Sequence, residues 1–300
     1  MKNILLSGGT GFVGTQLVNH LLSTFHDVQI TVLIRDEKDR QERSRVRYCI
    51  WNVKEDYISS DVPKDIDTII HLAGASIAEK RWTKERKKVL LESRMQSTKL
   101  LVDWVKTRGK QVNTFVSASA IGWYGEATTD RAFVEEDPAA NDFLAHVCAK
   151  WEAAAQPLVA TNVRTVWIRT GLVLHPDGGM WKEMKKAFAF RVAPRFGSGK
   201  QVFSWISIDD LLRLYTFAAV TPTIAGALNA VALKPEQQAI LTKKLLKKTS
   251  SFAIGMPIPA LALKIGLGEL SQELLKHAPV SSKKVEDAGF TFLHPTLDDL

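Results

Sequence analysis

A glycine-rich segment near the N-terminus constrains the fold more than any other feature of the chain. It reads Ser7-Gly8-Gly9-Thr10-Gly11-Phe12-Val13-Gly14, follows an apolar run at 3–7, and precedes apolar residues at helical spacing. Glycines three residues apart permit a tight turn, a close approach to a pyrophosphate and close packing of helix on strand. The N-terminus of such a helix offers free N–H groups and a positive dipole end to phosphates. The segment therefore predicts a dinucleotide-binding turn built from Gly8, Thr10, Gly11, Phe12, Val13 and Gly14.

Strand-like and helical segments alternate through the first 170 residues. After the run at 3–7, strands are predicted at 29–34, 45–51, 68–72, 114–117 and 165–168, with a long helix through 91–105. This alternation predicts an α/β fold with a doubly wound parallel sheet of the Rossmann type. We expect a dinucleotide-binding domain over residues 1–172 with a return segment at 204–232. A smaller α+β C-terminal substrate lobe is expected over 173–203 and 233–300.

Composition narrows the class of protein and its partners. The 300 residues are 45% hydrophobic and 24% charged, as in globular proteins, and the net charge of +8 favours anionic ligands. No basic–aromatic interleaving points to nucleic acid. The two cysteines, Cys49 and Cys148, indicate a reducing compartment, and no signal peptide or membrane span is recognisable. We expect a cytoplasmic protein with a small-molecule substrate, and neither a nucleic-acid nor a membrane partner.

The residues after the second predicted strand indicate which cofactor is bound. An acidic residue there would hold a ribose 2′-hydroxyl, whereas an arginine suits a 2′-phosphate. Arg35 comes first after the apolar run, which favours NADP(H) over NAD(H), and Asp36 keeps NAD(H) open. Asn52 could meet the adenine edge or be a turn residue. The small residues of Leu72-Ala73-Gly74 leave room for a cofactor above the end of the fourth strand.

The stretch Ser117-Ala118-Ser119-Ala120-Ile121-Gly122-Trp123-Tyr124-Gly125 brings a family resemblance into view. Together with the glycine pattern and strand order, it resembles the extended (atypical) short-chain dehydrogenases/reductases of the NAD-dependent epimerase/dehydratase superfamily. Within that superfamily the chain resembles a bacterial branch of epimerase family proteins, also described as cell-division-inhibitor-like. Supporting stretches lie at 151–154, 169–174, 197–201 and 288–292, so the resemblance covers nearly the whole chain.

The resemblance implies a catalytic serine, a tyrosine and a lysine four residues beyond the tyrosine. Ser119 matches the serine, which would hydrogen-bond a substrate oxygen. At the tyrosine–lysine position the chain has His146 and Lys150, so a histidine would manage the proton and the lysine would hold the cofactor ribose. Alternatively, His146 is only a helix residue near the pocket. Tyr124 is a second candidate proton donor and substrate contact, or a packing residue.

A segment in the second half of the chain resembles the substrate-side loop of the family. Arg195 and Gln201 flank Gly197-Ser198-Gly199-Lys200, and their donors could hold a phosphorylated or nucleotide-linked ligand. The alternative is a surface turn. No metal site is predicted, because the seven histidines show no metal-ligand spacing.

Two functions follow as expectations. The first is an NADP(H)-dependent epimerase or oxidoreductase that transfers hydride on a carbonyl or nucleotide-linked substrate. The second is a catalytically weak NADP(H)-binding sensor or regulatory protein, an alternative that the histidine at 146 keeps open. By analogy with related enzymes, the long helix could form a homodimer face, or its apolar stripe could cover its own sheet.

Overall fold

A central sheet with helices on both faces organises the chain. The computed structural model describes residues 1–129, 131–249 and 252–300. The strand order is β12-β7-β6-β5-β1-β2-β3-β4, and every pair is parallel except β3 with β4. The strands are β1 (Asn3–Ser7), β2 (Gln29–Ile34), β3 (Val46–Asn52), β4 (Tyr57–Ile58), β5 (Thr68–His71), β6 (Thr114–Ala120), β7 (Arg164–Thr170) and β12 (Gly226–Ala230). The prediction of a doubly wound parallel sheet is confirmed.

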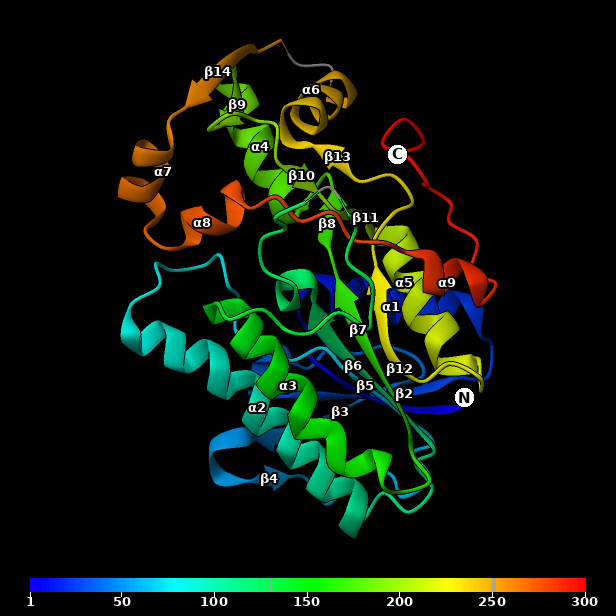
Figure 1. Cartoon of the computed structure of the whole chain (residues 1–300). Coiled ribbons are helices and arrows are strands. Elements are labelled where there is room, and N and C mark those ends of the chain that lie inside the picture. The colour runs from blue at the N-terminus through cyan, green and yellow to red at the C-terminus, as the bar shows by residue number, and fades with distance from the viewer. Residues whose placement is uncertain (130, 250–251) are drawn as a thin grey trace.

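The helices cover the sheet in two layers (Figure 1). α2 (Lys84–Thr107) and α3 (Phe143–Val159) lie on one face, and α1 (Phe12–Thr24) and α5 (Ile208–Val220) lie on the other. Both faces of the strands are therefore buried, which is why β1, β2 and β5 are almost continuous apolar runs. On α2, Thr98, Val102 and Val105 are buried, so the apolar stripe of this helix covers its own sheet.

The strand order places a switch point at β1. The chain first adds β2 and β3 on one side of β1, then crosses to add β5, β6 and β7 on the other. Ser7, the last residue of β1, pairs with Leu33 of β2 and with His71 of β5. In open α/β sheets, ligands bind outside the carboxyl ends of the strands at such a point.

Two strands run further than the sequence predicts. β6 continues to Ala120 and β7 to Thr170, and Ala118, Ser119 and Ala120 pair with Ile168, Arg169 and Thr170. Small and polar residues have weak strand propensity, so the sequence pattern stops at residues 117 and 168. Pairing between two buried strands overrides that propensity, and it brings Ser119 beside Arg169.

A smaller lobe stands over the carboxyl edge of the sheet (Figure 1). Its core includes Trp181, Met184, Phe188, Trp205 and Leu241. Its helices are α4 (Gly179–Ala189), α6 (Gln238–Lys248), α7 (Ala260–Leu267) and α8 (Leu270–Leu275). Its short strands are β8 (Leu172–His175), β9 (Val192–Phe196), β10 (Val202–Phe203), β11 (Trp205–Ser207), β13 (Glu236–Gln237) and β14 (Ile254–Ile258).

The C-terminal tail returns to the large domain. Val285 of α9 (Lys283–Asp287), with Phe290 and Phe292, is buried in the same core cluster as α1 and α5. Figure 1 shows α9 beside α5. The prediction that the lobe includes all of 233–300 therefore differs from the packing of this tail, whose Phe290 packs against Phe217 of α5. The other domain boundaries stay a prediction. Among the described residues, no helix has the length and apolar character needed to cross a bilayer.

Candidate cofactor and substrate site

The glycine turn between β1 and α1 closes on itself and on β5. The Gly11 amide donates to the Gly8 carbonyl oxygen at 3.1 Å. A Cβ on Gly14 would lie 2.1 Å from that same oxygen. Gly8 has a φ of +74°, and a Cβ there would lie 2.8 Å from the Ala73 nitrogen. These two glycines are therefore required by close backbone contacts, and the turn meets the segment 72–74 predicted to face the cofactor.

Within the described residues, no side chain caps the first amides of α1. Gly11 is the N-cap residue and has no capping side chain, and the first turn carries no acidic residue. The amides and the positive end of the helix dipole are thus available to an anion. The chemistry of these donors fits a diphosphate.

At the end of β2, the acidic residue is engaged by its neighbour. Asp36 caps the short helix Glu37–Asp39 by accepting from the Lys38 amide at 3.1 Å, and it pairs with Lys38 Nζ at 2.9 Å. The hydrogen bonds from Lys38 lower the pKa of Asp36. Arg35 is exposed beside it. Asp36, which would hold a ribose 2′-hydroxyl, is therefore engaged by Lys38 within its own turn. Arg35 is exposed and can reach a ligand.

A hollow of about 200 Å³ lies between the glycine turn and the segment after β2. Gly9 and Thr10 line one side, and Lys38, Gln41, Arg43 and Tyr48 are among the residues on the other. On the same side of the sheet, Asn52 ends β3 and accepts from the Lys54 amide at 3.1 Å, so its side chain caps a turn. Arg35 and Asn52, which are predicted to face the adenosine half of the cofactor, therefore lie at the ends of β2 and β3, on the same edge of the sheet as the glycine turn after β1.

Ser119 belongs to a buried polar network at the ends of β6 and β7. Its hydroxyl donates to Glu152 Oε1 at 2.6 Å. Arg169 donates to the two oxygens of Glu152 at 2.9 and 3.0 Å. Ser119, Glu152 and Arg169 are all buried. A fork of this kind holds the carboxylate in one orientation and aims it at the serine.

Tyr124 continues the same network toward β12. It is 2% exposed, donates to Asn229 Oδ1 at 2.7 Å and accepts from Arg169 at 3.0 Å. Burial raises the pKa of Tyr124 to about 12. The guanidinium of Arg169 also lies 3.8 Å from the centre of the Trp123 ring. Tyr124 is thus held among protein partners, with its proton directed at an asparagine.

The structure does not bring His146 and Lys150 to Ser119. α3 turns about 100° per residue, and the residues that face the end of β6 are Leu144, Cys148 and Glu152. Cys148 Sγ lies 3.6 Å from the Ala120 carbonyl oxygen, and Leu144 packs where a Cβ on Gly122 would be. His146 and Lys150 lie on nearly the opposite side of the helix and are exposed. The roles expected for this pair therefore lack the geometry they require.

The predicted substrate-loop residues also have structural partners. Gln201 is buried, and its amide donates to the carbonyl oxygens of Phe196 and Leu274 at 3.1 and 2.9 Å. Arg195 is exposed, and its stem packs where a Cβ on Gly199 would stand. Gln201 thus ties the turn after β9 to α8, while the guanidinium of Arg195 remains at the surface of the lobe.

Comparison with known proteins gives the family. Residues 4–229 match the NAD dependent epimerase/dehydratase family, and residues 258–300 match a domain of unknown function. An epimerase family protein of Staphylococcus haemolyticus is 35% identical over 99% of this chain and 97% of its own length. The chain belongs to the NAD-dependent epimerase/dehydratase family.

Two solved epimerase-family structures resemble this family member along its whole length. The human epimerase family protein (isoform 2), crystallised with NADPH, is 26% identical with a TM-score of 0.87, covering 99% of this chain and 97% of that one. The nucleoside-diphosphate sugar epimerase of Corynebacterium glutamicum is 31% identical with a TM-score of 0.77, and the match covers 99% of this chain and 56% of that one. The extended short-chain dehydrogenase/reductase resemblance is thereby confirmed.

Sequence reasoning missed the partners of Ser119 in this epimerase-family chain. Glu152, Arg169 and Asn229 form the buried network, and nothing in the local sequence of Glu152 or Asn229 distinguishes them from surface residues. Arg169 alone carries a signal: it stands inside the apolar strand 164–170, and a charge there requires a buried partner of opposite sign.

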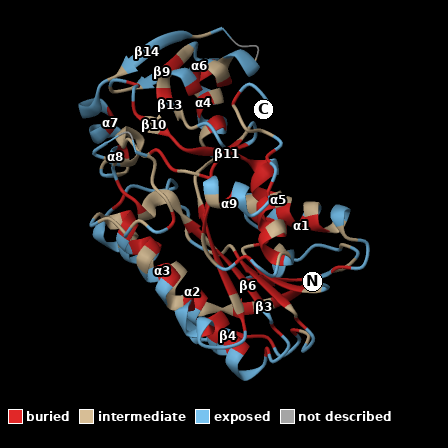
Figure 2. Ribbon diagram, turned by 45° about the vertical axis from the view of Figure 1, so that its right-hand side comes forward, coloured by how far each residue is buried: buried red, intermediate tan, exposed pale blue. Residues whose placement is uncertain are grey.

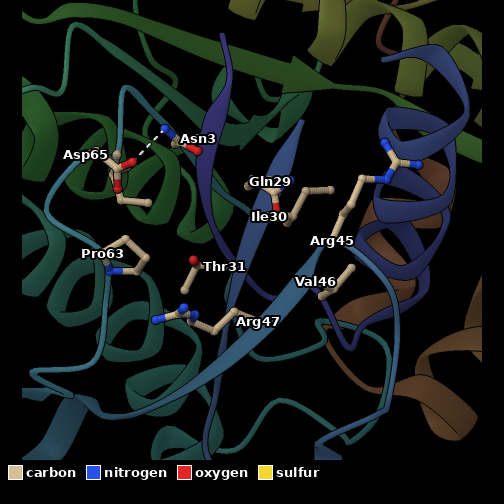
Figure 3. A pocket seen from close by; sticks show the side chains of 10 residues that line it. Asn3, Gln29, Ile30, Thr31, Arg45, Val46, Arg47, Pro63 and Asp65 are labelled. Carbon is tan, nitrogen blue, oxygen red and sulfur yellow. Dashed lines mark hydrogen bonds between the residues drawn. The ribbon is translucent and has the colours of Figure 1, made fainter. Parts of the chain in front are cut away.

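A larger hollow, about 400 Å³, lies at the other edge of the sheet (Figure 3). It is lined by the starts of β1, β2 and β3, where Asn3 donates to Asp65 at 3.0 Å. Arg45, at its rim, already donates to three carbonyl oxygens around the end of α1. Because ligands bind at the carboxyl ends of parallel strands, we place the functional site at the opposite edge despite the smaller hollow there.

Proposed function

We propose that this chain is an NADP(H)-dependent oxidoreductase or epimerase that transfers hydride on a small carbonyl-bearing or nucleotide-linked molecule. The observation that carries the proposal is the end of β2, where Lys38 engages Asp36 while Arg35 stays exposed. A ribose diol needs a free acidic acceptor, and a 2′-phosphate needs a cation. The NADPH bound by the human relative supports the same choice.

The residues that would hold the cofactor follow the ends of the strands. The amides of 12–14 would face the diphosphate, since the Gly11 amide donates to Gly8. Arg35 would face the 2′-phosphate, and the side-chain NH₂ of Asn52, whose oxygen caps a turn, would face the adenine edge. The backbone of 72–74 would line the nicotinamide half, because this segment touches the glycine turn. A bound nicotinamide supplies or accepts the hydride.

Ser119 would act toward the substrate as a hydrogen-bond acceptor. Its proton is directed at Glu152, so it offers lone pairs to a ligand. It is therefore set to accept a hydrogen bond from a substrate hydroxyl. As that hydroxyl loses its proton to Ser119, the serine proton can pass to Glu152, and Arg169 holds the carboxylate in place. Lys150 and His146 have no part in this scheme.

The alternative, a sensor with little turnover, also has an observation in its favour. Leu144 and Cys148 occupy the face of α3 that meets the end of β6, and they are four residues apart, like the tyrosine and lysine implied by the family resemblance. Leucine carries no proton, and burial raises the pKa of the Cys148 thiol to about 12. Turnover would then depend on Ser119 and Glu152 alone.

Calorimetric titration with NADPH and NADH tests the cofactor assignment. We expect the wild-type protein to bind NADPH more tightly, and Arg35→Ala to lose about tenfold in NADPH affinity with NADH little changed, about 1.4 kcal/mol. Arg40→Ala is the matched control, because this nearby exposed arginine pairs with Glu37. If neither nucleotide binds the folded wild-type protein, the proposal fails.

Turnover with a panel of alcohols, ketones and sugar nucleotides separates the two functions. An enzyme of the proposed type loses turnover in Ser119→Ala and Glu152→Gln while it retains NADPH binding, and His146→Phe remains active. Tight NADPH binding with no turnover for any member of the panel supports the sensor instead.

A further inference from the structure

Arg94 of α2 lies beside the end of β5, close to the predicted nicotinamide segment. A Cβ on Gly74 would stand 3.2 Å from both Cγ and Cζ of Arg94, so the glycine leaves room for the side chain. On the other side, the Arg94 guanidinium carbon lies 5.0 Å from the centre of the Trp151 ring on α3. The guanidinium is therefore held between the backbone after β5 and an indole of α3, and its side chain is half-buried.

The donors of Arg94 are scarcely used by the protein. Among the residues that the structure describes, its one hydrogen bond runs from Nη1 to the Leu90 carbonyl oxygen within its own helix, at 3.0 Å. Arg164, a comparably buried arginine, donates to four acceptors, and Arg169 donates to a carboxylate, a phenol and a carbonyl. Within the described part of the chain, no carboxylate lies in ion-pair distance of Arg94.

The surroundings of Arg94 leave its charge uncompensated. Burial lowers the pKa of Arg94. The Cys148 thiol raises this pKa, the neighbouring Arg86 lowers it, and no aspartate or glutamate among the described residues contributes. His71, behind it, stays neutral because burial lowers the pKa of His71 to about 3. A desolvated cation without a counter-charge is costly. A planar fork with free N–H groups is the arrangement that recognises carboxylate or phosphate.

The topology separates Arg94 from the phosphates of the cofactor. The proposed diphosphate and 2′-phosphate sites lie at the ends of β1 and β2, whereas Arg94 lies on the other side of β1, against β5 and α3. The buried network that includes Ser119 lies at the end of the next strand, β6. An anion at Arg94 would thus belong to the molecule bound beside the nicotinamide half.

We propose that Arg94 recognises an oxyanion, a carboxylate or a phosphate, on the substrate. The inference rests on the proposed function and names the class of its substrate: an acidic small molecule whose anionic group sits between the end of β5 and α3 while its hydroxyl faces Ser119. Gly74 and Trp151 position the guanidinium, and Glu152 serves the oxygen that reacts.

Anion binding by the NADPH-loaded protein tests the proposal. Sodium malonate and inorganic phosphate serve as probes in calorimetric titrations, and their relative affinities distinguish a carboxylate from a phosphate site. We expect at least one to bind, and Arg94→Gln to weaken it at least tenfold. Lys99→Gln is the matched control: it removes the same charge from an exposed position on the same helix and should bind the anion as wild type does.

Several outcomes would overturn the assignment. Absence of anion binding by wild-type protein that still binds NADPH refutes the role of Arg94 and leaves the proposed function standing. So does an unchanged anion affinity in Arg94→Gln. Weaker NADPH binding in that variant with unaltered anion binding would make Arg94 a cofactor contact instead. If Arg94→Gln does not fold, Arg94→Lys keeps the charge but loses the fork, and an anion affinity equal to wild type would contradict the proposal.

Discussion

At the residue scale, the buried side chain of His71 makes the stability of the fold depend on pH. It is fully buried at the end of β5, where Nδ1 meets Ser7 Oγ at 2.5 Å and Nε2 meets Thr98 Oγ1 at 3.0 Å. Burial, and then the charge of Arg94, lower the pKa of His71 to about 3. The folded protein therefore keeps this imidazole neutral over a range in which the unfolded chain, with a pKa near 6.5, takes up a proton.

The predicted consequence is a stability contribution that is lost in acid. It is fully present above about pH 6.5 and declines as the pH falls toward 3, because only the unfolded state gains the proton. At pH 5 the loss should be about 2 kcal/mol. Urea denaturation at pH 7.5 and 5.0 measures it: His71→Gln should show a smaller difference between the two pH values than wild type. His146→Gln, at an exposed site, is the control, and an equal effect in both variants would refute the assignment.

The same scale shows what sequence could not supply. Ser119 is recognisable from its motif, but its partner Glu152 lies 33 residues away, and only helix rotation decides which residues of α3 face it. A spacing of four fits two pairs on this helix. His146 with Lys150 and Leu144 with Cys148 both satisfy it, and chemistry alone favours the first pair, which faces away from Ser119. The three-dimensional packing of α3 against β6 selects the second.

At the scale of elements, the glycine turn depends on backbone contacts that a single methyl group would break. A Cβ on Gly14 would approach the Gly8 carbonyl oxygen to 2.1 Å, so Gly14→Ala must displace the turn. We expect a loss of stability of about 1–3 kcal/mol and a fall of at least tenfold in NADPH affinity. Thermal unfolding and calorimetry measure both quantities. Gly255→Ala is the control, because nothing lies within 4 Å of a Cβ there, and a Gly14→Ala protein with wild-type NADPH affinity would argue against the turn as the diphosphate site.

Elements buried on both faces were the ones that sequence could predict. β1 and β2 were located with the bounds that the structure has, since a continuous apolar run between breakers has few alternatives. In the lobe, β10, β11 and β13 are only two or three residues long and pair with distant segments. Such strands exist because tertiary contacts hold them, so local periodicity carries no signal for them. Figure 2 shows the contrast, with buried strands at the centre and much of the lobe rim exposed.

At the scale of the whole molecule, the surplus of positive charge belongs to the lobe that stands over the proposed site. Residues 173–203 and 233–276 contain 13 lysines and arginines against 5 aspartates and glutamates, a surplus of 8 that equals the net charge of the entire chain, 40 against 32. The rest of the chain is balanced. Because this lobe stands above the carboxyl edge of the sheet (Figure 1), its field points at the place where an anionic cofactor would enter.

Association with NADPH should therefore be steered by the lobe and weakened by salt. Stopped-flow measurements between 25 and 500 mM NaCl should show the association rate falling by about tenfold with a smaller change in the dissociation rate, since screening acts on the encounter. The double substitution Lys182→Glu with Lys243→Glu, which lowers the net charge by 4, should slow association at low salt. Lys106→Glu, near the C-terminus of α2 and far from the carboxyl edge, lowers the net charge by 2 and should have little effect. Equal slowing per charge in the two variants would show that net charge, and not its placement over the site, governs the encounter.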